Sequence, residues 1–254
     1  MTQSQQDDAD RVRLDQLLTQ AGHFETRARA RDAVTRGSVQ VNGQLCTKPG
    51  TRVQRNSPLT VCDGAQNYVS RAALKLIAGL DHFDFDVSGH NALDIGASTG
   101  GFTQVLLERG AAHVTAVDVG HGQLHPSLES DRRISNHEGV NARALDANIL
   151  AGRSIGTIVS DVSFISLKLA LPPALKLASE GCFCILLVKP QFEAGREAIG
   201  KGGLLKDPGL GPEIAKDLAQ WLDSQPGWKN IGTIPSPIKG SDGNLEYLLG
   251  GTKS

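Results

Sequence analysis

Between residues 68 and 254, short apolar segments alternate with segments of helical periodicity, and this alternation limits the possible folds more than any other feature. Strands that alternate with helices along a chain usually pair in parallel and are covered by helices. We therefore expect an α/β fold with a doubly wound, mostly parallel sheet. The seven predicted strands are residues 92–95, 113–117, 134–139, 155–160, 182–188, 231–238 and 244–249. A short glycine-containing segment joins the last two, which predicts an antiparallel hairpin at the edge of the sheet.

A glycine-rich segment, Asp94-Ile-Gly-Ala-Ser-Thr-Gly-Gly, follows the first of these strands. In a doubly wound sheet the ligand lies beyond the carboxyl ends of the strands, and glycines let the chain approach it closely. Asp118 ends the next strand, where a carboxylate can accept both hydroxyls of a ribose. Ala97-Ser98-Thr99 stands where the pyrophosphate of a dinucleotide requires a glycine. The segment therefore favours S-adenosylmethionine, which has no phosphate, over NAD and over a glycine turn without a ligand.

We expect this cofactor to contact the glycine-rich segment, the first turn of the following helix and two acidic residues further along the chain. The expected contacts are Asp94, Gly96, Ser98, Gly100, Gly101, Phe102, Asp118 and Asp146. His121 and His125 have a spacing that could bind a metal on a helix, but they lack a third ligand and Pro126 interrupts the segment. We therefore expect no metal requirement.

Two lysines and two carboxylates lie near the ends of the predicted elements. Asp161 and Lys189 end strands 155–160 and 182–188, Glu246 begins the last strand, and Lys75 lies on a helix before the first. A single lysine after an apolar strand is usually a surface charge, but these four form a neutral set in which every charge can be paired. Such a set suits methyl transfer to a ribose 2′-hydroxyl, because the alcohol must lose its proton as it attacks the methyl group.

The hypothesis gives each of the four residues a role. Lys189 lies nearest the hydroxyl, Asp161 orients it beside the methyl group, and Lys75 and Glu246 form a supporting pair. An amine beside another cation and away from water gives up its proton more readily, so a lysine can act as the base or stabilise the alkoxide. The sequence leaves open which member of the set first accepts the proton.

The front of the chain is basic. Residues 11–55 include nine basic and three acidic residues, whereas residues 58–254 include 17 and 21. Apolar periodicity predicts a helix over residues 14–21 and a second one after Thr26, and Val39-Gln40-Val41-Asn42-Gly43 predicts a hairpin. The planar fork of arginine suits phosphate, so this unit is typical of RNA binding, with a solvated helix face as the alternative. The arginines expected to bind RNA are Arg11, Arg13, Arg27, Arg29, Arg31 and Arg36.

The composition is that of a globular protein without membrane segments or a disulfide framework. Hydrophobic residues make up 39% of the 254 residues, and the longest apolar run covers only residues 182–188. The first ten residues are polar and acidic, unlike a signal peptide. We therefore expect a cytoplasmic protein, with Cys182 and Cys184 in the core of the sheet rather than in a redox pair.

Several motifs together resemble one family. Arg13-Leu-Asp-Gln-Leu-Leu, Arg27-Ala-Arg-Ala-Arg and Arg36-Gly-Ser-Val-Gln-Val-Asn-Gly are similar to the S4 domain, an RNA-binding module. The four charged residues, with the glycine-rich segment between the first two, resemble the Lys-Asp-Lys-Glu tetrad of FtsJ-like 2′-O-ribose methyltransferases. With Asp118-Val-Gly-His-Gly-Gln-Leu and Lys189-Pro-Gln-Phe-Glu-Ala-Gly, the chain from residue 11 to 250 resembles the TlyA family. His121 departs from the pattern, since an aromatic residue such as tyrosine is expected there.

The resemblance implies a Rossmann-like methyltransferase domain behind a small α+β S4 domain. It implies S-adenosylmethionine as the methyl donor and the 2′-hydroxyl of a cytidine in ribosomal RNA as the acceptor, in 23S RNA and in some members also in 16S RNA. The implied partners are ribosomal RNA or ribosomal subunits, with no membrane and no protein partner. Members of the family often carry the name haemolysin.

We predict a disordered tail over residues 1–10, the S4-like domain over 11–57, a linker over 58–67 and the methyltransferase domain over 68–254. Two other functions stay open: an RNA-binding ribosome-assembly factor without catalysis, and a membrane-active haemolysin. The glycine-rich segment 195–211 is either a mobile surface loop or a lid that contacts RNA. Ser70 is expected to cap a helix over residues 71–79.

Overall fold

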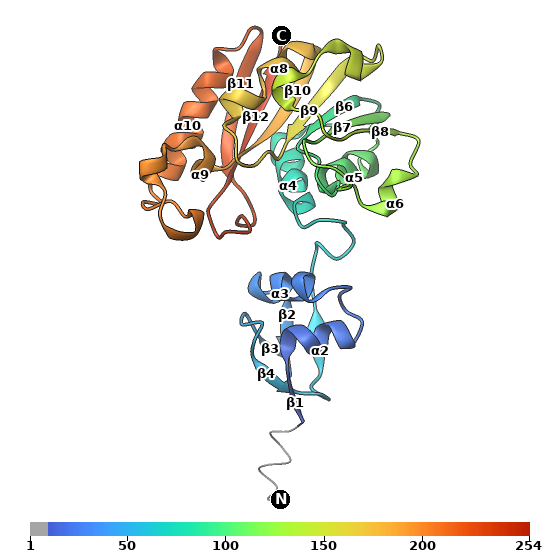
Figure 1. The fold of residues 1–254 in the computed structure, drawn as a ribbon, viewed down its shortest axis with the longest axis vertical. Helices are drawn as coiled ribbons and strands as arrows, with labels where there is room; N and C mark the ends of the chain where they lie inside the picture. Colours follow the sequence, from blue (N-terminus) through green and yellow to red (C-terminus); the bar gives the residue numbers. More distant parts are fainter. Residues whose placement is uncertain (1–9) are drawn as a thin grey trace, which may run out of the picture. The chain divides into compact units, whose positions relative to one another are not determined.

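The contacts within the chain divide it after Asn67 into two units, of which the second is Tyr68–Ser254 (Figure 1). The structure, a computed structural model, describes residues 10–254. The predicted tail over residues 1–10 therefore lies outside the described residues, apart from Asp10, which is exposed.

The first unit consists of two short helices and small antiparallel strands. Its elements are β1 (Arg11–Arg13), α2 (Leu14–Gln20), α3 (Arg27–Thr35), β2 (Val39–Val41), β3 (Gln44–Leu45), β4 (Arg52–Gln54) and β5 (Leu59–Val61). Thr26 caps α3, because its hydroxyl accepts a hydrogen bond from the N–H of Arg29. Asn42 and Gly43 both have positive φ in the turn between β2 and β3. The predicted helices and hairpin are confirmed.

A seven-stranded sheet forms the centre of the second unit, in the order β11-β12-β10-β9-β6-β7-β8. The strands are β6 (Asn91–Ile95), β7 (His113–Val117), β8 (Ile134–His137), β9 (Ile155–Ser160), β10 (Ala178–Val188), β11 (Trp228–Pro235) and β12 (Tyr247–Lys253). Strands β6 to β10 pair in parallel, and β12 runs antiparallel to both β10 and β11. The predicted sheet with its antiparallel edge hairpin is confirmed, and β12 is inserted between β10 and β11.

The last strand begins later than predicted, at Tyr247 instead of Asn244. Residues 240–244 form a tight turn, in which the N–H of Gly240 donates to the carbonyl of Asn244 at 3.0 Å. The N–H of Asn244 donates in turn to the carboxylate of Asp242 at 3.1 Å. Glu246 therefore lies just before the strand.

The register of the sheet brings separate parts of the chain to one edge. Ser160 pairs with Ile95 on one side and with Leu186 on the other, and Val188 pairs with Tyr247. Because the parallel strands all end at this edge and β12 begins there, the residues next to these strand ends lie close together. They are Gly96, Asp161, Lys189 and Glu246.

Helices cover both faces of the sheet (Figure 1). One face packs against α4 (Ala73–Phe83) and α5 (Gly101–Glu108), and the other against α7 (Leu167–Ala170), α8 (Pro172–Leu177) and α10 (Leu210–Asp223). The remaining short helices are α6 (Pro126–Glu129), α9 (Pro190–Glu193), η1 (Ala142–Ala144), η2 (Ala147–Leu150), η3 (Arg196–Ala198) and η4 (Lys201–Gly203). Each face of the sheet thus has its own apolar core.

The helix predicted over residues 71–79, the first of the second unit, has other bounds in the structure. It corresponds to α4, which runs from Ala73 to Phe83, so the predicted bounds are wrong. Ser70 accepts a hydrogen bond from the N–H of Ala72, before the helix begins. Gly79 does not end the helix but packs against β10: a Cβ at this position would lie 3.0 Å from Cγ2 of Ile185. The glycine allows the helix to approach the sheet closely.

Cys182 and Cys184 are buried in β10, as predicted. Burial raises the pKa of the Cys182 thiol to about 12, which is far from the value of a reactive cysteine. Among the helices of residues 10–254, none is long and apolar enough to cross a membrane.

Replacement of Ile185 by alanine should lower the free energy of unfolding of the second unit by about 2–5 kcal/mol, because it leaves a cavity between β10 and α4. Ile185 is fully buried, whereas Ile231 on β11 is 44% exposed, so Ile231→Ala should cost less than about 0.5 kcal/mol. Both tryptophans, Trp221 and Trp228, lie in the second unit, so urea unfolding followed by tryptophan fluorescence measures its stability. Equal losses in the two variants would contradict this packing.

Candidate functional site

The loop between β6 and α5 turns sharply over the end of β9. Gly96 has a φ of +82°, and a Cβ there would lie 2.8 Å from the main-chain oxygen of Asp161. Only glycine meets both conditions without strain, so Gly96 lets β6 and β9 end side by side. The N–H of Ser98 donates to Oδ2 of Asp118 at 2.8 Å, which fixes the same loop to the end of β7.

A cavity of about 460 Å³ opens beyond the ends of β6, β7 and β9. Its walls are largely apolar, formed by Ile95, Val117, Val119, Val140, Ala142, Val162, Phe164, Ile165 and Ala170. The polar side chains around it are those of Ser98, Asp118, Gln123, Asn141, Asp161 and Ser163. The carboxylate of Asp118 accepts one N–H at each oxygen, from Ser98 and from Gly120, and each oxygen retains a further acceptor site for a ligand.

A smaller cavity of about 160 Å³ adjoins the first. Gly96, Ser98, Asp161 and Ser163 line both, so the two cavities meet at the end of β9. Lys189 lines only the smaller one. A group that extends from the larger cavity past Asp161 therefore reaches the ammonium of Lys189.

Two lysine–carboxylate pairs lie at this edge of the sheet. Lys189 Nζ is 2.6 Å from Oδ1 of Asp161, and Lys75 Nζ is 2.5 Å from Oε2 of Glu246. Lys75 and Glu246 are both buried, and buried charges are stable only when paired. Burial raises the pKa of the Glu246 carboxyl above its ordinary value, and the ammonium of Lys75 opposes this rise. The charges of Lys189 and Asp161 also act on Glu246, so the structure brings the four residues into one coupled group.

Asp94 lies fully buried beneath the glycine-rich loop. Its Oδ2 accepts a hydrogen bond from the hydroxyl of Thr103 at 2.7 Å, whereas its Oδ1 has no partner among the residues that the structure describes. Burial, together with the carboxylates of Asp161 and Asp118, raises the pKa of Asp94 to about 7. A cation bound near these three carboxylates would be stabilised by all of them.

The other residues predicted to bind a cofactor lie in different environments. Gly100 and Gly101 stand at the start of α5, and Gly101 lines the smaller cavity together with Phe102. The Phe102 side chain is otherwise buried in the core between α5 and the sheet. Asp146 is exposed and lines neither cavity; its carboxylate caps η2 by accepting the N–H of Asn148 at 2.8 Å.

Sequence reasoning missed two polar residues that lie a few positions beyond strand ends. Asn141 follows β8, lines the larger cavity and caps η1 with its side chain. Ser163 follows β9, and its hydroxyl accepts a hydrogen bond from Lys189 Nζ at 2.6 Å. Their place just after strands of a parallel sheet is the signal that could have identified both.

Glu138 is a further missed residue, which shapes the larger cavity without lining it. Its carboxylate accepts hydrogen bonds from the N–H groups of Gly122, Gln123 and Leu124. These hydrogen bonds lower the pKa of Glu138 to about 2. Because Gln123 lines the cavity, Glu138 holds one of its walls in place.

Within residues 10–254, no three His, Cys, Asp or Glu side chains come together as a group that could hold a metal ion. The imidazole of His125 accepts the N–H of Ser127 and caps α6. His121 lies against Gly139, where a Cβ would meet its ring. Both histidines thus have structural contacts in this part of the unit.

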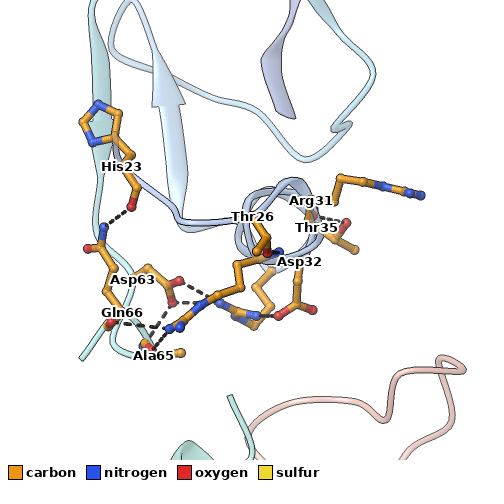
Figure 2. A network of polar contacts seen from close by, with 10 residues as sticks. His23, Thr26, Arg31, Asp32, Thr35, Asp63, Ala65 and Gln66 are labelled. Carbon is orange, nitrogen blue, oxygen red and sulfur yellow. Dashed lines mark hydrogen bonds and ion pairs between the residues drawn. The ribbon is translucent and has the colours of Figure 1, made fainter. Parts of the chain in front are cut away.

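The arginines of the first unit differ in how accessible they are. The Arg36 side chain is only 12% exposed, and its guanidinium binds the carboxylates of Asp63, at 2.8 Å, and of Asp32. Figure 2 shows the network around Asp32 and Asp63, with Arg31 extending away from it. Arg31 and Arg11 are exposed. Arg36 therefore stabilises the fold, although in the sequence it belongs to the same basic segment as the exposed arginines.

Arg13 and Arg27 share one buried carboxylate. Asp15 is fully buried. It accepts two hydrogen bonds from Arg13, at 3.1 and 2.9 Å, and two longer ones from Arg27, at 3.4 and 3.3 Å. The side chains of Arg13 and Arg27 remain 47% and 54% exposed, so both keep donors for a ligand. Arg29 is partly exposed and donates to the carbonyl of Ala65. Asp15 thus fixes two guanidinium groups side by side.

Two family models match the chain. The model described as FtsJ-like methyltransferase matches residues 68–253, and the model of the S4 domain matches residues 12–58. The matches fall on either side of the division at Asn67.

Known proteins match nearly the whole chain. The 16S/23S rRNA (cytidine-2'-O)-methyltransferase TlyA of Mycobacterium tuberculosis is 43% identical over 242 residues, which cover 95% of this chain and 90% of that protein. YqxC of Bacillus subtilis, named as an rRNA methyltransferase, is 44% identical over 239 residues, 93% of this chain and 84% of that protein. A solved structure from Streptococcus thermophilus, named as a hemolysin, is 38% identical with a TM-score of 0.73, and the match covers 96% of this chain and 89% of that one.

The free energy of unfolding of the second unit should fall as the pH rises from about 4 to about 7, because of Asp94. The folded protein holds the proton of Asp94 up to a pKa of about 7, whereas the unfolded chain loses it near pH 4, its ordinary value. A rise in pH through this window therefore favours the unfolded chain, by an amount on the order of 3 kcal/mol.

Asp94→Asn should remove this part of the pH dependence, because the amide stays neutral and its oxygen can still accept the Thr103 hydroxyl. Urea unfolding of both proteins at pH 4.5 and pH 7.5 measures the difference, and comparison of the two cancels the titration of all other groups. The same pH dependence in the variant and the parent protein would show that Asp94 titrates normally.

Proposed function

Since the chain belongs to the FtsJ-like methyltransferase family, and to the TlyA family within it, we propose that it methylates the 2′-hydroxyl of a cytidine in ribosomal RNA, with S-adenosylmethionine as the methyl donor. The observation that carries this proposal is the Lys189–Asp161 pair at the junction of the two cavities, coupled to the buried Lys75–Glu246 pair. The acceptor is proposed to lie in 23S RNA, with 16S RNA as a second acceptor. The M. tuberculosis relative carries both in its name.

The apolar walls of the larger cavity and the carboxylates beside it suit S-adenosylmethionine. Apolar side chains suit an adenine ring, and Asp118 stands at the end of the second parallel strand, the position that suits a carboxylate for ribose hydroxyls. Asp94 has a buried oxygen without a partner among the described residues, and Asp161 adds a further negative charge beside it. When bound, this cofactor supplies a methyl group on a positively charged sulfur. The residues that would hold it are Asp94, Gly96, Ser98, Gly100, Gly101, Phe102 and Asp118, with Asn141 in place of Asp146.

The Lys189–Asp161 pair is proposed to act on the attacking hydroxyl. With the cofactor bound, its methyl group would be available to the hydroxyl oxygen. The hydroxyl proton would pass to this pair, whose carboxylate can accept it while the lysine stays an ammonium. Lys189 Nζ is held by Asp161 and by Ser163, each at 2.6 Å, so the ammonium has a fixed position in the smaller cavity. A positive charge placed there stabilises the negative charge that develops on the oxygen. Asp161 orients the lysine.

The Lys75–Glu246 pair supports the first pair. Glu246 precedes Tyr247, which pairs with Val188, so the carboxylate lies beside the start of the Lys189 segment. Its negative charge balances that of Lys75, and it also attracts the charge of Lys189 through space. This buried pair keeps the site neutral as a whole, which lets two lysines stand close together.

The first unit is proposed to bind ribosomal RNA through phosphate contacts. Exposed guanidinium groups on β1 and α3 can each donate to two phosphate oxygens, and shape and phosphate contacts are the usual means of recognising structured RNA. The proposed RNA-binding residues are Arg11, Arg13, Arg27, Arg29 and Arg31, while Arg36 supports the fold. We propose residues 11–57 as this domain and 68–254 as the catalytic domain. Of the predicted linker 58–67, Leu59–Val61 forms β5, which pairs with β2, so this part of the segment belongs to the first unit.

The complete set of paired charges favours catalysis over the alternative of an assembly factor without activity. An inactive binding protein has no need for a buried lysine and carboxylate at the edge of the cofactor cavity, since burying such a pair without a function rarely improves stability. Release of dye from lipid vesicles tests the other alternative, a membrane-active haemolysin, and is expected not to occur.

Lys189→Ala should lower the turnover of methyl transfer by about 10²–10⁴-fold, because the developing charge on the oxygen loses its partner. The affinity for S-adenosylmethionine, measured by calorimetry, should stay near that of the parent protein, since Lys189 does not line the larger cavity. The assay uses radiolabelled S-adenosylmethionine and ribosomal subunits from cells that lack this protein.

Lys168→Ala is the matched control, because it removes a lysine that pairs with Asp217 on the surface of the same unit. It should retain full activity. Normal turnover in Lys189→Ala would rule out the proposed role of this residue.

Arg31→Ala should weaken binding to 23S RNA and reduce the slope of log affinity against log salt by about one, because one phosphate contact is lost. Arg36→Ala should instead destabilise the first unit by about 3 kcal/mol, because it leaves the buried carboxylate of Asp63 without its partner. Filter binding at several salt concentrations measures the first effect, and amide hydrogen exchange in α3 measures the second. An unchanged salt slope in Arg31→Ala would exclude α3 from the RNA interface.

A further inference from the structure

A cavity of about 280 Å³ lies beside the four charged residues and has no part in the mechanism above. Pro190 and Leu245 line it, and they are the chain neighbours of Lys189 and Glu246. The cavity and the paired charges are thus formed by the same two stretches of chain. Its walls also include Leu204, Leu205, Pro208 and Lys239.

Asn244 joins two segments of the cavity wall that are distant in the sequence. Its side chain is buried; Oδ1 accepts the N–H of Leu205 at 3.0 Å, and Nδ2 donates to the carbonyl of Gly203 at 2.9 Å. These bonds join the segment after α9 to the connection between β11 and β12, at the same end of the sheet (Figure 1). The glycine-rich segment 195–211 thus provides a fixed wall, anchored two residues away from Glu246.

The apolar walls of the cavity remain open to solvent. Leu204 is 42% exposed and Leu245 is 48% exposed, although both belong to a folded cavity beside a candidate active site. Exposed leucines at one place are stabilised when a partner covers them. Lys239 at the same cavity is exposed and pairs with no carboxylate among the described residues. An apolar surface with a free cation beside it matches a nucleotide, which presents a flat base and an anionic phosphate.

We propose that this cavity binds the nucleotide that follows the methylated one on its 3′ side. Its base packs against Leu204 and Leu245, and its phosphate lies at Lys239. The 2′-hydroxyl that is methylated lies on the same ribose as the 3′-phosphate, so a 2′-hydroxyl at Lys189 brings the 3′ neighbour to the adjoining residues. This inference rests on the proposed function, and it adds a substrate subsite that the four charged residues do not provide.

The Leu204→Ser, Leu245→Ser double variant should raise the KM for ribosomal RNA by about tenfold, because a packed base is lost. Lys239→Gln should reduce the salt slope of RNA binding by about one. In both variants kcat should change less than about twofold and the affinity for S-adenosylmethionine should not change, because the paired charges and the larger cavity stay intact. Leu169→Ser and Lys176→Gln are the controls, since both residues are exposed elsewhere on the same unit, and both variants should behave as the parent protein.

Photocrosslinking identifies the nucleotide directly. Ribosomal RNA that carries 4-thiouridine is irradiated with the full-length enzyme, and the attached peptide is identified by mass spectrometry. Crosslinks from residues 239–245 to the nucleotide on the 3′ side of the methylated cytidine support the inference, and their absence overturns it.

A protein occupant would give a different pattern. If the variants lose affinity for assembled ribosomal subunits but bind protein-free 23S RNA normally, the cavity binds a ribosomal protein and the inference is wrong. If the parent enzyme methylates no ribosomal RNA at all, the proposed function itself fails. If the parent enzyme is active and the variants match the controls, only the subsite is excluded.

Discussion

The pairing of two ammonium groups with two carboxylates at one edge of the sheet is the interaction on which the second unit depends. Lys75 comes from α4 and Glu246 from the residue before β12, and neither charge could be buried alone. Lys189 and Asp161 follow the neighbouring strands β10 and β9. The order of the strands makes these contacts possible, because β12 lies directly beside β10. If β12 lay outside β11, Glu246 would stand one strand further from Lys189, about 5 Å away from its present position.

The fold of the second unit could be predicted because its strands are short apolar runs that alternate with segments of helical periodicity. The errors occurred where tertiary contacts override local signals. Gly79 has the sequence signature of a helix end, yet it lies inside α4, because a close approach to Ile185 requires a residue without a side chain. The start of β12 was misplaced because Asp242 and Asn244 hold their own turn, and those hydrogen bonds have no signature in apolar periodicity.

The candidate site was predictable as far as it follows from strand ends. Asp118, Asp161, Lys189 and Glu246 stand directly at such ends, and Lys75 reaches Glu246 from α4. Asn141 and Ser163 lie a few positions beyond the strand ends, in loops whose direction the sequence pattern does not determine. Arg31 and Arg36 look alike in the sequence, and what separates them is Asp63, a partner 27 residues from Arg36 that no local pattern reveals. Distant partners of this kind become visible only in three dimensions.

The insertion of β12 between β10 and β11 also sets the order in which the protein can mature during synthesis. The residues around the larger cavity all precede β11 in the chain, so they are available before the carboxylate of Glu246 is. Until β12 enters the gap beside β10, a nascent chain has an unfilled hydrogen-bonding edge and a lysine at position 75 without its counter-ion. Charge balance at this edge of the sheet is therefore a late event in biogenesis, and a partly made molecule that already holds the residues of the larger cavity is still unable to form the complete set of paired charges.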